Sequence, residues 1–258
     1  VKSREQIQKL AEGLNKANTE LKRFDTVKSE FVSIAGHQLR APLTVIKGYT
    51  SLIQEGTIDA LSGKGKEALD RIRIATEQLV KLVSDLLNLS RIESGKIKYE
   101  FTQGDFSKLV EEIVSEFKVP AEKKSVKVVF TNKASNLPPL TFDSDKMREA
   151  MVNLIDNAIK YSKPGGEVRV AAKKVSALKG ERIRVEVKDS GLGIKPEDIP
   201  RLFIKFARME EAQRVDPGGM GIGLYFVKRV VKDHGGRVGA QSEGIDKGST
   251  FWFELPVK

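Results

Sequence analysis

His37 is the residue with the clearest capacity for covalent chemistry in this sequence, and its surroundings are helical in pattern. Apolar residues recur around it at helical spacing, namely Phe31, Ile34, Ala35 and Leu39. Pro42 has no N–H, so it leaves the carbonyl of Gln38 without its helical partner and is expected to bend the helix. A nucleophilic imidazole on such a helix could accept a phosphoryl group. A surface histidine beside a helix kink is the simpler interpretation of this stretch alone.

A second group of polar residues lies in the segment from 153 to 162. Asn153, Asn157 and Lys160 follow one another at spacings of four and three, which places them on one face of a helix. Carboxamide oxygens can ligate a hard cation such as Mg²⁺, and a lysine can meet phosphate as a point charge. The same three residues, taken alone, are also what a solvent-facing helix surface would carry.

Two glycine-rich segments could approach a nucleotide. The first, Asp189 to Ile194, follows a strand pattern, and the carboxylate of Asp189 could accept a hydrogen bond from an adenine amino group. Its glycines, Gly191 and Gly193, would let the backbone come close to the ring. A glycine turn of this kind occurs in many loops and is a weak indication by itself.

The second glycine-rich segment, Gly218 to Leu224, opens a helix. Backbone N–H groups at such a helix start can surround phosphate, and the helix dipole favours the negative charge. The spacing differs from the dinucleotide fingerprint, and the absence of a Gly-Lys-Ser/Thr sequence excludes a P-loop. The preceding segment, 208 to 217, is polar and lacks apolar periodicity, which predicts a mobile lid over a nucleotide.

Composition limits the classes of protein that remain. The 258 residues are 40% hydrophobic and 31% charged, as expected of a soluble globular chain with one large or two ordinary domains. No apolar run approaches the roughly 20 residues that cross a bilayer, and no signal peptide is visible. Without cysteine, and with only His37 and His234, disulfides, thiolate chemistry and a zinc site are excluded. The net charge of +10 suits acidic partners, but no basic run with interleaved aromatics favours nucleic acid.

The first part of the chain is patterned as two long helices. Heptads over residues 1–30 predict a coiled-coil helix that continues into the His37 helix. Gly56, Gly63 and Gly65 interrupt the apolar pattern, and the second helix is expected to end near Gly95. Its predicted apolar seam consists of Leu69, Ile72, Thr76, Leu79, Val83 and Leu86. Such a hairpin cannot enclose a core alone, so we expect a homodimer that forms a four-helix bundle.

The pattern changes after Gly104 to a mixture of helices and strands. We expect helices over 106–117, 144–162 and the end of 218–233, strands over 126–130, 168–170 and 183–187, and a terminal hairpin over 237–255. This mixture indicates an α/β sandwich of about 150 residues. The predicted domains are therefore a coiled-coil helix over 1–30, a helical hairpin over 31–96 and a sandwich over 104–258.

The order and spacing of these motifs resemble the sensor histidine kinases of two-component signalling. The resemblance extends from about Phe24 to Pro256 and includes the Phe203/Phe206 segment and the closing Gly-Ser-Thr250 sequence. In that family the hairpin dimerises and carries the phosphoacceptor, and the sandwich is an ATP-binding domain of the gyrase and histidine-kinase type. The fold class that the resemblance implies is α+β, a helical hairpin dimerising into a four-helix bundle and followed by this α/β sandwich.

The resemblance also implies residue roles. His37 would be the phosphoacceptor, Asn157 the Mg²⁺ ligand, and Arg208 a contact of the γ-phosphate. The remaining nucleotide contacts would be Asn153, Lys160, Tyr161, Asp189, Gly191, Gly193, Ile194, Gly219, Gly221, Gly223, Leu224 and Thr250. In the gyrase branch a glutamate that activates water stands where this chain has Asn153. An amide cannot take a proton, so the resemblance favours transfer to histidine over hydrolysis of ATP.

Two positions depart from the family pattern. An acidic residue commonly follows the phosphoacceptor histidine, whereas this chain has Gln38, which can orient the ring but cannot remove its proton. We therefore expect slower autophosphorylation. Four residues after the histidine, relatives often carry Thr or Asn, which orients water for dephosphorylation of the partner. Ala41 stands there in this chain, so we expect weak phosphatase activity.

The implied function is autophosphorylation of His37 by ATP and Mg²⁺, followed by phosphoryl transfer to an aspartate of a response regulator. The implied partners are a second copy of the chain and a receiver domain, with no nucleic acid and a membrane only through a missing N-terminal region. The expected location is cytoplasmic. One alternative is a nucleotide-binding signalling scaffold, a pseudokinase in which His37 is not phosphorylated, and Gln38 is the feature that favours it. A plain ATPase is less favoured because this chain has no base to activate water for hydrolysis of ATP.

Overall fold

The computed structural model describes residues 38–59, 62–132, 137–177 and 180–257, so His37 and the predicted coiled coil of residues 1–30 lie outside the described residues. The chain divides into two compact units, Val1–Leu86 and Leu87–Lys258. Within the described ranges, no helix is both long enough and apolar enough to cross a membrane.

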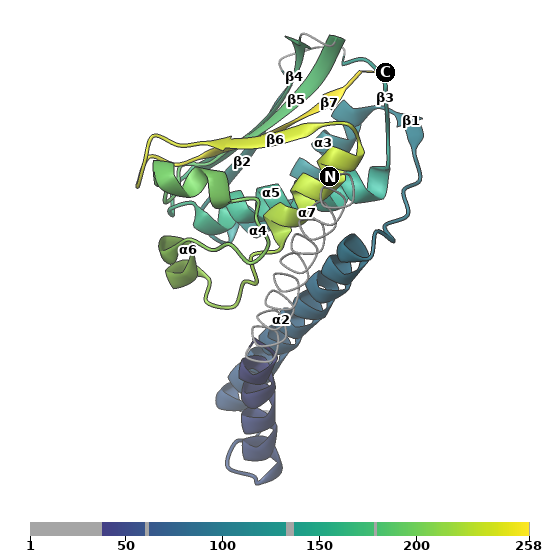
Figure 1. The fold of residues 1–258 in the computed structure, drawn as a ribbon. Helices are drawn as coiled ribbons and strands as arrows, with labels where there is room; N and C mark the ends of the chain where they lie inside the picture. Colours follow the sequence, from purple (N-terminus) through teal and green to yellow (C-terminus); the bar gives the residue numbers. More distant parts are fainter. Residues whose placement is uncertain (1–37, 60–61, 133–136, 178–179, 258) are drawn as a thin grey trace, which may run out of the picture. The chain divides into compact units, whose positions relative to one another are not determined.

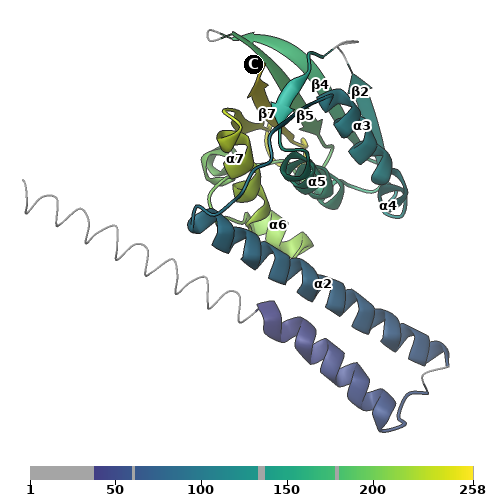
Figure 2. The same cartoon turned by 90° about the vertical axis from the view of Figure 1, so that its right-hand side faces the viewer.

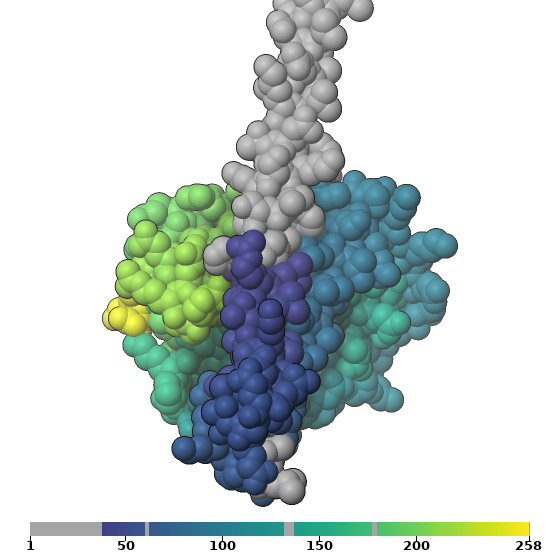
Figure 3. Space-filling view, turned by 90° about the horizontal axis from the view of Figure 1, so that it is seen from below, coloured from purple at the N-terminus to yellow at the C-terminus, as the bar shows by residue number. Residues whose placement is uncertain are grey.

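The first unit contains a helical hairpin. A helix over residues 38–54 and the first part of α2 (Gly63–Glu93) lie side by side and antiparallel (Figures 1 and 2). Figure 3 views this hairpin from its loop end, where the two helices form one continuous surface. The first helix continues across Pro42, which is buried.

The loop of the hairpin is shorter than the sequence suggests. Gly63 and Gly65, predicted as helix breakers, lie in the first turn of α2, and of the three predicted breakers only Gly56 is outside a helix. The N–H of Gly65 donates to the hydroxyl of Ser62 over 3.0 Å. Because this capping bond satisfies a backbone donor that the first turn leaves free, the helix can begin with glycine.

The buried face of α2 differs by one residue from part of the predicted seam. Ala68, Ala75 and Leu82 recur every seven residues and are 1%, 3% and 6% exposed. Leu69 and Val83, which we predicted in the seam, are 50% and 47% exposed. The face that the hairpin buries therefore lies one residue before these two seam positions, and burial of the predicted seam in a dimer stays a prediction.

The second unit is built on a five-stranded sheet in the order β2-β4-β5-β7-β6. Its strands are β2 (Lys127–Asn132), β4 (Glu167–Ala177), β5 (Gly180–Lys188), β6 (Arg237–Gln241) and β7 (Thr250–Pro256). β2 is parallel to β4, and the other neighbours are antiparallel. Alternation in β5 and β7 buries Val185 and Phe253 completely, as the period of two in the sequence predicts.

Three helices cover one face of this sheet: α3 (Phe106–Glu116), α5 (Ser144–Tyr161) and α7 (Gly223–Asp233) (Figures 1 and 2). The carboxylate of Asp105 caps α3 by accepting from the N–H of Lys108 over 3.1 Å. Asp143 caps α5 in the same way, from the N–H of Lys146 over 2.9 Å. The predicted α+β fold, a helical hairpin followed by an α/β sandwich, is confirmed.

Several short elements were not predicted. They are β1 (Thr102–Gly104) and β3 (Leu140–Phe142), which pair antiparallel, α4 (Lys118–Glu122), the 3-10 helix η1 (Pro196–Arg201) and α6 (Glu210–Val215). α6 lies inside the segment 208–217 that we predicted as a mobile lid without apolar periodicity. The carboxylate of Glu211 in α6 pairs with Lys195 over 2.9 Å, a contact between side chains far apart in sequence that local periodicity could not indicate.

Candidate nucleotide-binding site

The polar face of α5 meets the start of α7. Asn153 donates from Nδ2 to the carbonyl of Glu149 over 2.9 Å, and its Oδ1 lies against Gly223, where a Cβ would come within 2.7 Å of it. Asn157, one turn further along, is half-buried, and within the described part of the chain its side chain makes no hydrogen bond. Its carboxamide oxygen is therefore available to a ligand.

Lys160 continues this face and is paired with the segment before α7. Its ammonium contacts the carboxylate of Asp216, and both side chains are 22% exposed. The same ammonium lies 5.6 Å from the ring centre of Tyr161. Burial, with the negative charge of Asp216 as the next cause, raises the pKa of Tyr161 to about 12, so the phenol is neutral at physiological pH.

Asp189 stands at the end of β5 and is only 4% exposed. One carboxylate oxygen, Oδ1, accepts from the N–H groups of Gly191 over 2.8 Å and of Ser249 over 3.2 Å. The hydroxyl of Ser249 donates to the other oxygen, Oδ2. Burial raises the pKa of Asp189, and these hydrogen bonds oppose the rise because they favour the carboxylate.

The loop after β5 is packed tightly against its neighbours. The carbonyl of Tyr161 accepts from the N–H of Leu192 over 3.2 Å, and a Cβ on Gly191 would overlap that carbonyl. Gly193 has φ +68° and faces the carbonyl of Gly244, which a Cβ would also overlap. Both glycines are thus required by the packing of the loop itself, and their approach to a ligand stays a prediction.

Ile194 and Thr250 extend the site toward the sheet. Ile194 is 7% exposed, and its N–H donates to the hydroxyl of Ser242 over 3.0 Å. Thr250 is half-buried at the start of β7, paired in register with Lys188.

The second glycine segment forms a turn that leads into α7. Gly221 has φ +70°, and its carbonyl accepts from the N–H of Phe206 over 3.1 Å. A Cβ on Gly219 would come within 2.6 Å of the carboxylate of Asp216. Leu224, in the first turn of α7, packs against the core from a half-buried position.

Arg208 is bound to the segment that it begins. Its guanidinium donates to the carbonyl of Pro217 over 3.1 Å and to that of Asp216. Gln38 lies in the other unit, at the start of the described part of the first helix, and is half-buried. The predicted catalytic set of His37, Gln38 and Arg208 is therefore divided between the two units.

The contacts within the second unit bring most of the predicted site residues together. Asn153 meets Gly223, Lys160 meets the lid segment, and Tyr161 meets the loop after β5. Sequence reasoning missed two residues of this group, Asp216 and Ser249. Ser249 lies within the predicted closing Gly-Ser-Thr sequence, and Asp216 opens an Asp-Pro-Gly-Gly turn, so each had a weak local signal.

Comparison with known families identifies the class. Residues 142–258 match the family described as histidine kinase-, DNA gyrase B- and HSP90-like ATPase, and residues 27–95 match the His kinase A phosphoacceptor domain. His37 lies within the second match. The chain belongs to the sensor histidine kinases.

Individual relatives agree with this assignment. Drug sensory protein A of Synechocystis sp. is 34% identical over 240 residues, which are 91% of this chain and 36% of that protein. The structure of full-length ShkA in complex with AMPPNP is similar with a TM-score of 0.63 and 26% identity, covering 88% of this chain and 45% of that one.

A further solved structure, histidine kinase ThkA in complex with response regulator protein TrrA, has the same fold. Its TM-score is 0.68 at 22% identity, and the match covers 90% of this chain and 63% of that one. The chain spans between 36% and 39% of the length of the first curated relatives that it matches.

Proposed function

We propose that this chain is the catalytic core of a protein-histidine kinase, which transfers the γ-phosphoryl group of ATP to His37 and then to an aspartate of a response regulator. The observation that carries the proposal is the assembled site of the second unit, in a chain whose residues 27–95 match a phosphoacceptor domain. The AMPPNP bound to ShkA and the response regulator bound to ThkA support it by analogy.

The proposed nucleotide contacts follow from the chemistry of the site. Asp189 Oδ2 has lone pairs that its one bond from Ser249 does not use, so it can accept from an exocyclic amino group. Asn157 offers a free carboxamide oxygen to Mg²⁺, which commonly completes its coordination with water and phosphate oxygens. When bound, Mg²⁺ would supply positive charge that neutralises part of the charge of the phosphates.

The proposed reaction is an in-line phosphoryl transfer. A ring nitrogen of His37 forms a bond to the γ-phosphorus, the bond to the β–γ bridging oxygen breaks with its electron pair, and ADP leaves. The ring loses its N–H proton to solvent, because neither Asn153 nor Gln38 can take it. Since Asn153 cannot activate water either, positioning and charge neutralisation favour transfer over hydrolysis.

The same proposal includes a second copy of the chain and a receiver domain as partners. α2 exposes large apolar residues beside its buried face, among them Leu69, Val80, Val83 and Leu87. A hairpin with such a surface fits dimerisation into a four-helix bundle. The alternative of a nucleotide-binding scaffold has Gln38 as its only support.

The deciding experiment is labelling with γ-phosphate-labelled ATP and Mg²⁺. We expect acid-labile, base-stable label on the parent chain and none on His37→Ala. The matched control is His234→Gln, which removes the only other histidine and should keep the label. Nucleotide binding without label would identify the scaffold, and release of phosphate without label would identify an ATPase.

A further inference from the structure

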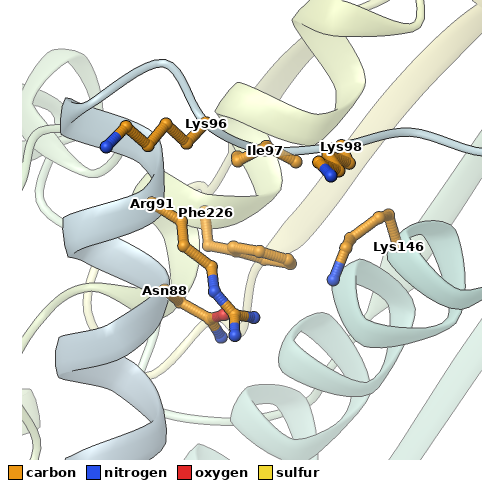
Figure 4. Close-up of a pocket in the computed structure, with 7 residues that line it drawn as sticks. All are labelled: Asn88, Arg91, Lys96, Ile97, Lys98, Lys146 and Phe226. Atoms are coloured by element: carbon orange, nitrogen blue, oxygen red, sulfur yellow. The ribbon is translucent and has the colours of Figure 1, made fainter.

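A cleft of about 320 Å³ lies within the second unit (Figure 4). Its lining residue Lys146 is near the start of α5, whereas Asn157 is near the end of that helix. The cleft is lined by Asn88 and Arg91 of α2, by Lys96, Ile97 and Lys98 of the following segment, by Lys146 of α5 and by Phe226 of α7. Lys146 and Asn157 are separated by about 16 Å along α5, at about 1.5 Å per residue. The cleft is therefore separate from the proposed nucleotide site.

The cleft carries positive charge that the described residues around it neutralise only at Lys146. Four of its lining side chains are cationic and none is acidic. Lys146 lies 3.6 Å from Glu149, whereas Arg91, Lys96 and Lys98 have no ion pair or side-chain hydrogen bond within the described residues.

Two carboxylates next to the cleft, one beside Lys146 and one two residues after Arg91 in sequence, have other partners. Glu149 also accepts from the side-chain amide of Asn88. Glu93, in the last turn of α2, accepts from Lys205 and from the hydroxyl of Tyr225, each over 3.1 Å. The positive charge of the cleft is thus available to a ligand.

The side chains are arranged around an apolar floor. Arg91 and Lys146 project their terminal nitrogens into the space from opposite sides, and the ring of Phe226 lies between them, whereas the ammonium of Lys96 points away (Figure 4). Phe226 is 3% exposed, and Ile97 is half-buried beside it. A site with cations at its rim and a ring at its floor matches a ligand that is both anionic and apolar.

We propose that this cleft binds a small organic anion, a carboxylate or phosphate joined to a compact apolar group such as an aromatic ring. The guanidinium of Arg91 can bind two oxygens of such an anion at once, and Lys146 and Lys98 add point charges. The apolar group packs on Phe226 and Ile97. The volume is at the lower end of the range of small-molecule sites, about 300–1,000 Å³, so the occupant is small.

Occupancy is expected to affect the nucleotide site. Phe226 lies one turn after Gly223, the residue of the second glycine segment at which α7 begins. Glu149, beside Lys146, supplies the carbonyl that accepts from Asn153. This coupling rests on the proposed function, whereas the binding of the anion does not.

The test is calorimetric titration of the full chain with phenyl phosphate. We expect one saturable site for phenyl phosphate per chain. The affinity for inorganic phosphate should be about tenfold lower, because this anion has no ring to pack on Phe226. Arg91→Gln should weaken phenyl phosphate about tenfold or more through the lost charged hydrogen bonds. The matched control is Arg71→Gln, which removes the same charge from the same helix at an exposed position outside the cleft.

A second variant identifies where the anion binds. Lys160→Gln alters the proposed nucleotide site and should leave the affinity for phenyl phosphate unchanged. The proposal is overturned if phenyl phosphate shows no saturable binding, or if the parent and Arg91→Gln bind it with equal affinity. It is also overturned if only Lys160→Gln loses affinity for phenyl phosphate. The coupling is tested separately, by the affinity for ADP with and without saturating phenyl phosphate, and equal values would exclude it.

Discussion

Asp216 places a negative charge beside the residues that the sequence predicts to bind phosphate. Its carboxylate contacts the ammonium of Lys160 and lies against Gly219, and its carbonyl accepts from Arg208. The positive charge that the sequence assigns to phosphate binding is therefore neutralised within the protein. A phosphate that binds beside Lys160 must compete with this carboxylate.

We expect Asp216→Asn to bind ATP about three- to tenfold more tightly, because the amide keeps the shape of the side chain but removes the competing charge. The measurement is titration of the parent and the variant with ATP and Mg²⁺. Glu211→Gln is the control, since it removes one negative charge from the same lid segment at the ion pair with Lys195. Weaker binding by Asp216→Asn would show that the carboxylate organises the lid instead of competing with phosphate.

Gln38 is expected to limit the rate of autophosphorylation, because it follows His37 where an acidic residue is common in the family. Gln38→Glu would provide a carboxylate able to take the proton of His37, so we expect the initial rate of labelling to rise about tenfold or more. Gln38→Ala provides neither a base nor an acceptor, so its initial rate of labelling should not exceed that of the parent. Equal rates for the parent and Gln38→Glu would contradict the idea that the missing base limits the reaction.

At the scale of elements, the sequence predicts what periodicity and caps determine. The helix over 144–162 and the terminal hairpin over 237–255 were predicted, and the local features that determine them are the cap Asp143 before an apolar pattern and the alternating apolar residues of β7. β1 and β3 were missed because three residues are too few to show a period. α6 was missed because its six residues are too few to show a helical period, and no local pattern encodes the pairing of Glu211 with Lys195.

The candidate site was predictable to a similar extent. Motifs indicated the side chains that the structure gathers on α5, the two glycine segments and β7. They did not indicate that Ser249 donates to Asp189, since the two residues are far apart in sequence and meet only through the pairing of β5 with β7. The seam of α2 as a dimer contact stays a prediction, because Leu69 and Val83 lie outside the face that a single hairpin buries.

The loop after β5 has a position that tolerates no side chain. Gly193→Ala would place a Cβ on the carbonyl oxygen of Gly244 and force φ +68° on an alanine. We expect the free energy of unfolding of the second unit to fall by about 2 kcal/mol or more. Calorimetric unfolding measures this change. Gly48→Ala, the same substitution in a helix with open space around the Cβ, should instead leave stability equal or slightly higher.

His234 ends α7 and makes the stability of the second unit depend on pH. Its Nδ1 lies 2.8 Å from the carbonyl of Val230, to which it donates, and its Nε2 accepts from the N–H of Asp143 over 3.0 Å. Burial lowers the pKa of His234, against the opposing charges of Asp143 and Asp233, so the folded protein favours the neutral ring. The ring therefore contributes stability fully above its unfolded pKa of about 6.5.

The stabilisation by the neutral ring decreases as the pH falls below about 6.5, the pKa of histidine in the unfolded chain, and it is lost once the pH passes the lower pKa of the folded state. The cause is that the unfolded chain binds a proton in this range more readily than the buried ring does. We expect the difference in thermal midpoint between the parent and His234→Gln to narrow from pH 7.5 to pH 5. The glutamine cannot ionise, and its side-chain oxygen can still accept from Asp143. A difference that stays constant across this range would contradict the neutral, buried ring.

At the scale of the whole molecule, the hairpin leaves an apolar surface that one chain does not cover. Leu69, Val80, Val83 and Leu87 are 47% to 65% exposed and form one stripe on α2. At about 100° per residue, this stripe is centred about 115° round the helix from Ala68, Ala75 and Leu82, which the hairpin buries. Two apolar stripes on adjacent sides of one helix are what a helix at the corner of a four-helix bundle presents.

We therefore expect Val80→Glu with Val83→Glu to dissociate the proposed dimer, weakening association about a hundredfold or more by burying unpaired charge. Sedimentation measures the mass, and nucleotide titration tests that the second unit is intact. Ile74→Glu is the matched control, because Ile74 is 39% exposed on another side of α2, and it should leave the mass unchanged. If the double variant and Ile74→Glu have the same mass as the parent, the stripe does not hold the dimer. Loss of the dimer in Ile74→Glu as well would place the contact around the whole helix, a result that a corner position in the bundle does not allow.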